Sequence, residues 1–143
     1  MILLDTTVLV YAVGSEHPLR TSAAAIIEAV GSGRIAATTI PEVIQEFTHV
    51  RARRRDRADA SALARDLVTL LTPLTPVTAA DLEGGLQLFD RHPDLGCFDA
   101  VLAAVARRVG ASLVSADGAF AAVPGGEHVP LGDDTLRRLG VTP

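Results

Sequence analysis

Short apolar runs alternate with longer helical segments along this chain of 143 residues, and this alternation constrains the fold most strongly. The runs at Ile2–Leu4, Ile35–Thr38 and Ser112–Ser115 are predicted to be strands, with a short fourth piece near Val129. Strands separated by helices form a mostly parallel sheet with right-handed crossovers. Because no linker or repeat interrupts the pattern, we expect a single α/β domain over residues 1–143.

The helical segments are bounded by recognisable capping signals. Thr78 and Asp81 resemble a capping box that opens one helix, and Thr39 with Glu42 fits a capping box that opens another. Gly110 is expected to end the last of them. The predicted helices cover residues from about 18 to 30, 41 to 54, 58 to 71, 78 to 91 and 98 to 109.

The composition excludes several classes of function. All 13 basic residues counted as Lys or Arg are arginines, so a Walker-A loop and Schiff-base catalysis lack the lysine that they need. The single cysteine, Cys97, excludes an intramolecular disulfide and a cysteine-based zinc cluster. No apolar run approaches the 18 residues or so of a membrane span, and Asp5 comes too early for a signal peptide. We therefore expect a cytoplasmic protein without a membrane partner.

Acidic residues follow the predicted strands or begin the helices beside them. Asp5 comes directly after the first predicted strand, and Asp117 follows the third. Asp99 lies in the first turn of the helix before the third strand. Ligand sites of open α/β sheets lie beyond the carboxyl ends of the strands, so these acids from distant segments could meet there. Each also has a local interpretation, because such acids form Asx turns or complement a helix dipole.

Glu42 and Glu46 both lie early in the helix after the second strand. The capping box would give Glu42 a structural role, whereas no local role explains Glu46 beside the apolar positions of that helix. A carboxylate at the margin of a buried face is costly unless a cation meets it. We therefore prefer Glu46 for the site and keep Glu42 as the alternative.

Four motifs in this order carry a resemblance to a known family. They are Leu4-Asp5-Thr6-Thr7, Val43-Ile44-Gln45-Glu46-Phe47, Phe98-Asp99-Ala100-Val101-Leu102-Ala103-Ala104 and Leu113-Val114-Ser115-Ala116-Asp117-Gly118-Ala119-Phe120. From residue 2 to about residue 123, the chain resembles a PIN domain, and it is most similar to the small VapC-type toxins of bacteria. The resemblance implies a three-layer α/β/α fold around a mostly parallel sheet of four or five short strands.

The resemblance also implies a function. PIN-domain toxins are endoribonucleases that use Mg²⁺ or Mn²⁺, held by acids that correspond to Asp5, Glu46, Asp99 and Asp117, with Thr7 as a helper. It further implies an RNA substrate, a cognate antitoxin and a homodimer. The chain departs from the family at Ser115, where Thr is common, and at Ala119, where many members have a further acid.

The proposed roles follow from the chemistry of phosphodiester hydrolysis, which develops negative charge that a hard divalent ion can stabilise. Mg²⁺ prefers carboxylate and water oxygens, so Asp5 would be a direct ligand and Asp99 a second one, direct or through water. Asp117 would hold a metal-bound water or a second ion. Glu46 would orient or deprotonate the attacking water. The hydroxyl of Thr7 would bond Asp5 or a phosphate, although a plain helix start explains Thr7 equally well.

A dense run of arginines lies at the end of the second predicted helix. It could bind the phosphates of RNA or an acidic partner protein, or it could simply complement the helix dipole. The run comprises Arg51, Arg53, Arg54, Arg55 and Arg57.

The net charge is explained by the proposed site. Without its four acids, 13 acidic residues balance 13 arginines, so the whole net charge of −4 can be assigned to the metal site.

Two other functions compete with the ribonuclease. The chain could be a catalytically silent PIN-like binding module, although it keeps all four acids. It could also be another α/β phosphohydrolase that uses Mg²⁺. A phosphatase with the Asp-x-Asp signature is excluded, because Thr7 stands where the second Asp would be.

Overall fold

A computed structural model of the chain, which describes residues 1–141, contains the predicted parallel sheet. Its strands lie in the order β2-β1-β3-β4, and all neighbouring pairs are parallel. Only the second strand is shorter than predicted. The last two residues of the predicted domain, 142 and 143, lie outside the described residues. The strands are β1 (Ile2–Leu4), β2 (Ala37–Thr38), β3 (Ser112–Ser115) and β4 (His128–Pro130).

All five predicted helices occur, with ends that differ by at most two residues. A helix start was one explanation of Thr7, but no helix range was predicted after β1. The sequence there is apolar and rich in valine on all sides and therefore lacks the amphipathic period of a helix. The helices are α1 (Thr6–Val13), α2 (Arg20–Gly31), α3 (Pro41–Arg54), α4 (Arg57–Leu71), α5 (Ala79–Arg91), α6 (Cys97–Val109), the 3₁₀ turn η1 (Gly118–Ala122) and the short, unpredicted α7 (Thr135–Arg138).

One of the two predicted capping boxes is present. At the start of α5, the Thr78 hydroxyl accepts a hydrogen bond from Asp81 N, and the Asp81 carboxylate accepts one from Thr78 N. The prediction for Thr39 was wrong, because the N-cap of α3 is Ile40. Thr39 still lies at the end of β2, where its hydroxyl donates to the carbonyl oxygen of Leu4 in the neighbouring strand at 2.7 Å.

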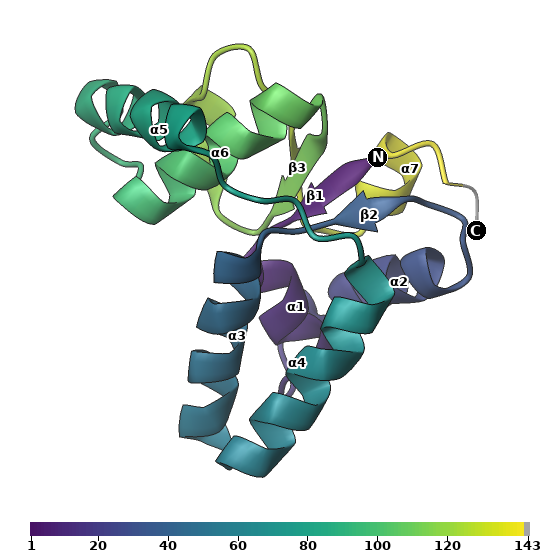
Figure 1. Cartoon of the computed structure of the whole chain (residues 1–143). Coiled ribbons are helices and arrows are strands. Elements are labelled where there is room, and N and C mark those ends of the chain that lie inside the picture. The colour runs from purple at the N-terminus through teal and green to yellow at the C-terminus, as the bar shows by residue number, and fades with distance from the viewer. Residues whose placement is uncertain (142–143) are drawn as a thin grey trace.

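Helices cover the sheet on both sides (Figure 1), with α5 and α6 on one side and α1 and α2 on the other. The α3–α4 pair extends away from the sheet beside α1. Leu3, Leu4 and Val114 in the central strands are completely buried, and they form the middle of one hydrophobic core. No helix in residues 1–141 combines the length and the apolar character needed to span a bilayer.

Two helices approach unusually closely at the side of the sheet. A Cβ atom at Gly85 of α5 would lie 2.5 Å from Val101 Cγ2 and 2.7 Å from Val101 Cα of α6. Only glycine permits this distance, since real Cβ atoms do not approach a backbone so closely. The close packing fixes α5 against α6, which carries Asp99 in its first turn.

Candidate active site

Four carboxylates from four distant segments line one pocket of about 220 Å³. Asp5 follows β1, Glu46 lies on α3, Asp99 lies in the first turn of α6, and Asp117 follows β3. The parallel strands β1 and β3 are neighbours, so their carboxyl ends present Asp5 and Asp117 at the same edge of the sheet. The structure thus brings together the four acids that the sequence singled out.

Asp5 is held by a set of short hydrogen bonds and is only 4% exposed. Its Oδ1 accepts from Thr6 N at 2.7 Å, which caps α1. Its Oδ2 accepts from Thr7 Oγ1 at 2.8 Å and from Ser115 Oγ at 2.6 Å. Since donors from β3 and from α1 converge on it, the carboxylate has a fixed orientation at the bottom of the pocket. The predicted contact between Thr7 and Asp5 is present.

Glu46 lies on the exposed side of α3, and its side chain lines the pocket. It is held there by a hydrogen bond from Thr6, the residue after Asp5. Thr6 Oγ1 donates to Glu46 Oε2 at 2.5 Å, so one of the two carboxylate oxygens is fixed. Glu42, one turn earlier, is not among the side chains that line this pocket. Its Oε2 is buried, and no residue within the described range donates a hydrogen bond to it.

Asp117 both forms a local turn and lies in the site, two roles that the sequence analysis treated as alternatives. Its Oδ1 accepts a hydrogen bond from Ala119 N at 2.9 Å and caps η1. Its own backbone N–H donates to Ser115 Oγ at 2.9 Å, so a single hydroxyl joins Asp117 to Asp5. The side chain also lines the pocket, and the turn therefore positions the carboxylate rather than replacing its role in the site.

Asp99 is the acid of this pocket that has the fewest hydrogen bonds. Within the described residues no hydrogen bond to its carboxylate is formed, and its helix begins at Gly96 without a side-chain cap. The pKa of Asp99 is raised from 3.8 to about 6, by burial first and then by the charges of Asp5, Asp117 and Glu46. A desolvated carboxyl group among like charges favours its neutral form.

This donor set fits a hard divalent cation. All four groups offer carboxylate oxygens, and the charges of the other three contribute, after burial, to the raised pKa of Asp99. In residues 1–141, no three Asp, Glu, His or Cys side chains are grouped so that they could hold one ion together. Mg²⁺ does not require such a group, because it takes one or two carboxylates directly and keeps several waters.

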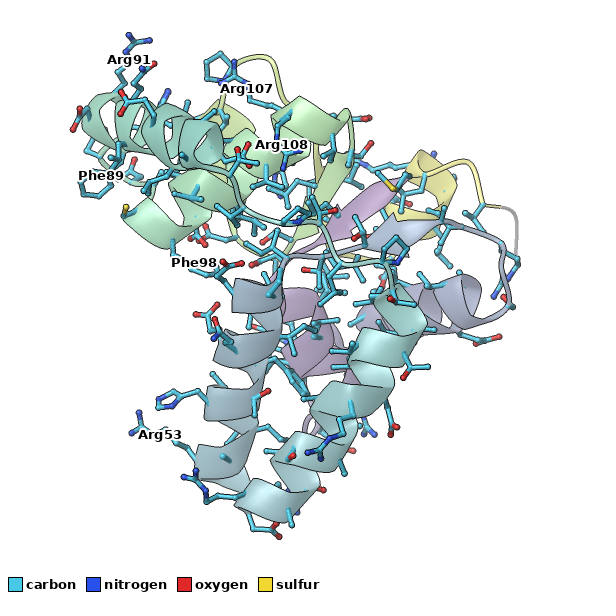
Figure 2. The ribbon with its side chains drawn as sticks, viewed as in Figure 1. Arg53, Phe89, Arg91, Phe98, Arg107 and Arg108 are labelled. Atoms are coloured by element: carbon cyan, nitrogen blue, oxygen red, sulfur yellow. The ribbon has the colours of Figure 1, made fainter. Side chains whose placement is uncertain are left out.

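The arginine run at the end of α3 divides into different environments. Arg51 donates from Nε to Asp59 Oδ2 at 2.6 Å and from its Nη1 to the carbonyl oxygen of Val13 at 3.0 Å, which ties α3 to α4 and α1. Arg54 lines the carboxylate pocket, whereas Arg53 points away from α1 and α4 (Figure 2). The two remaining arginines line other cavities of the α1, α3 and α4 region, Arg55 beside α1 and Arg57 at the start of α4.

Sequence reasoning missed several side chains that shape the site. Thr6 orients Glu46, Ser115 links two acids, and Tyr11 of α1 lines the pocket. The two hydroxyls were visible in the sequence, one directly after Asp5 and one two residues before Asp117. Tyr11 gave no such signal, because its position depends on the helix α1, which the sequence did not predict.

Comparisons with known proteins place the chain in a family. The family model described as "PIN domain" matches residues 2–126. The chain is 55% identical over 131 residues to Ribonuclease VapC7 of Mycobacterium tuberculosis, covering 90% of both chains. It is 36% identical over 116 residues to Ribonuclease VapC23 of the same species, covering 80% of this chain and 90% of the relative.

Solved structures share the fold at low sequence identity. A VapBC2 structure from Rickettsia felis, bound to promoter DNA, matches with a TM-score of 0.73 at 18% identity, over 92% of this chain and all of that one. The M. tuberculosis toxin VapC20, which cleaves the sarcin–ricin loop, matches with a TM-score of 0.69 at 23% identity, over 85% of this chain and 94% of that one. At such identities the likeness concerns the fold alone.

Proposed function

The chain belongs to the PIN-domain family, and from this premise we propose that it is a VapC-type endoribonuclease, the toxin of a toxin–antitoxin pair. The observation that carries the proposal is the convergence of Asp5, Glu46, Asp99 and Asp117 in one pocket. Such a cluster is costly without a cation, and hydrolysis of a phosphodiester is a reaction that uses one. The expected place of action is the cytoplasm.

The proposed cofactor is Mg²⁺ or Mn²⁺, which Asp5 and Asp99 would hold, directly or through water, with Asp117 holding a metal-bound water. When bound, the ion stabilises the negative charge that develops on the phosphoryl oxygens. The hydrogen bonds from Thr6, Thr7 and Ser115 orient the Asp5 carboxylate in advance, so the chain loses little freedom when the site fills.

Glu46 is the proposed base for the attacking water. The hydroxyl of Thr6 occupies Oε2, so the other carboxylate oxygen is the one that would accept the water proton. The water oxygen then forms a new bond to phosphorus, and the old P–O bond breaks with its electron pair on the departing ribose oxygen. Glu42 has no place in this scheme, because its side chain does not line the pocket.

The proposal includes two protein partners, a cognate antitoxin and a second copy of this chain. An apolar stripe on α5 suits the second copy, since Leu82, Leu86 and Phe89 recur at helical spacing and are 49%, 40% and 46% exposed. Figure 2 shows Phe89 directed away from the body of the molecule. Phe89→Glu should therefore shift the protein from dimer to monomer in sedimentation or light scattering, and a wild-type monomer would contradict this assignment.

The experiment that tests the activity compares wild type with Asp5→Ala on total RNA, with and without Mg²⁺ or Mn²⁺. The matched control is Asp66→Ala on the exposed side of α4, which removes the same charge away from the pocket. Discrete fragments from wild type and Asp66→Ala, but not from Asp5→Ala, would support the ribonuclease. Intact RNA at every metal concentration, from protein free of antitoxin, would favour the catalytically silent binding module instead.

A further inference from the structure

Two cavities meet beside Arg54. The carboxylate pocket is one of them, and the other is a cavity of about 420 Å³ between the ends of α1 and α3. Val10 and Arg54 line both. We propose that Arg54 binds a phosphate of the RNA and that this second cavity receives the nucleotide next to the scissile bond, an inference that rests on the proposed ribonuclease function.

The guanidinium of Arg54 is available to bind a ligand. Arg51 has its donors committed to Asp59 and to the Val13 carbonyl, and it therefore acts as a structural clamp. Arg54, by contrast, is exposed and makes no side-chain hydrogen bond or ion pair with any residue in the described range. A guanidinium fork that is free of protein partners matches a phosphate in both charge and shape.

Arg54 is also well placed relative to the four acids. A substrate phosphate would be repelled by four carboxylates unless cations stood beside them, and metal ions at the acids supply only part of that charge. Arg54 lies on the same helix as Glu46, two turns further along, and side chains of a helix lean toward its N-terminus. Its guanidinium therefore leans back toward the carboxylates, and it lines their pocket.

The second cavity combines apolar and basic side chains. Its walls include Val10, Val13 and Val50, which are partly exposed, and three arginines lie around it. This combination suits a nucleotide, which has flat apolar faces on its base and a negative charge on its phosphate. An acidic peptide would satisfy the arginines but would leave the apolar wall without a partner.

Neighbouring arginines provide a matched comparison. Arg53 is exposed like Arg54, yet it lines neither cavity, and Figure 2 shows it directed away from α1. Arg54→Ala should lower kcat/KM for a short RNA about tenfold or more, with an unchanged melting temperature, and Arg54→Lys should restore part of the loss. Arg53→Ala removes the same charge and should cost less than about twofold.

The salt dependence of RNA binding tests the contact between Arg54 and a phosphate independently of cleavage. For single-stranded RNA, each lost phosphate contact reduces the slope of log K against log salt concentration by about 0.7. Binding to Asp5→Ala protein, which holds RNA without cutting it, should show this reduction when Arg54→Ala is added. No such reduction is expected when Arg53→Ala is added.

The cavity itself is tested by filling it. Ser15 lines it and is exposed, so Ser15→Trp should fill the space without disturbing the core. The assay uses a series of RNAs, each one nucleotide shorter than the last. Wild type should stop cleaving the series at the RNA that lacks the nucleotide bound in this cavity. Ser15→Trp should cut long and shortened RNAs at the same low rate, because its cavity no longer distinguishes them.

These experiments distinguish failure of the proposed ribonuclease function from failure of the role assigned to Arg54 and the second cavity. If the wild type cuts no RNA, the proposed function itself is wrong. If the wild type cuts RNA but Arg54→Ala and Arg53→Ala lose activity equally, the ribonuclease stands and the role of Arg54 is refuted. If Ser15→Trp still distinguishes long from shortened RNAs as wild type does, the nucleotide is not bound in this cavity.

Discussion

Replacing Asp99 with Asn tests whether burial and like-charge crowding of this carboxylate make the metal-free site unstable. The pKa of Asp99 is raised from 3.8 to about 6, by burial first and by its acidic neighbours second. The folded protein therefore binds this proton more tightly than the unfolded chain does. Between pH 3.8 and about 6 the free energy of unfolding falls as pH rises, and above that range the loss is complete.

The magnitude follows from the same two values. The difference between 3.8 and about 6 corresponds to about 3 kcal/mol of unfolding free energy at neutral pH. The pocket is open to solvent and salt, so we expect about 1–2 kcal/mol of that amount to be observed. Since Asn cannot ionise, Asp99→Asn should recover this energy and raise the melting temperature by about 3–8 °C.

Thermal melts in EDTA measure this effect, with Asp66→Asn on α4 as the matched control. At pH 7.5 Asp99→Asn should melt above wild type, and near pH 4 the difference should close, because the wild-type carboxyl group is then largely neutral. Added Mg²⁺ should stabilise wild type more than Asp99→Asn. A lower melting temperature for Asp99→Asn at pH 7.5 would refute the reasoning, and an equal rise in Asp66→Asn would assign the effect to overall charge.

Two further predictions concern packing and support of the site. Gly85→Ala should lower stability by about 1–3 kcal/mol in urea unfolding, because its Cβ would meet the Val101 backbone, whereas Gly84→Ala should gain up to about 1 kcal/mol of helix propensity. An equal gain in both variants would contradict the close approach of α5 and α6. Ser115→Ala should lower RNA cleavage about tenfold through loss of its hydrogen bond to Asp5, and Ser115→Thr should restore it. Unchanged cleavage by Ser115→Ala would show that the hydrogen bond from Ser115 to Asp5 is not needed for activity.

The convergence of the acids could be predicted because it depends on topology alone. Asp5 and Asp117 follow strands that the sequence showed to be apolar and short, and parallel neighbours present their carboxyl ends at one edge. The position of Asp99 followed in the same way from the helix before β3. These statements require the order of elements and no knowledge of individual side-chain contacts.

The missed features depend on contacts between distant segments. Thr39 was predicted to cap α3 from its local sequence, but β1 lies beside it and its hydroxyl bonds the Leu4 carbonyl. Arg51 belonged to an undivided run of arginines until α4 brought Asp59 within 2.6 Å. In both cases the local pattern was compatible with several partners, and the tertiary fold supplied the one that the side chain contacts.

The hydrogen-bonding pattern explains why the ionised form of Asp99 is destabilised within the cluster of acids. The hydroxyl of Ser115 donates to Asp5 and accepts from the backbone of Asp117, so one buried side chain supports the acids that follow both central strands. Glu46 receives its hydrogen bond from Thr6. Asp99 alone of the four acids receives none within the described residues, and it faces the charges of the other three. It is therefore the carboxylate whose ionised form a divalent cation would stabilise most, and metal binding and its deprotonation should occur together.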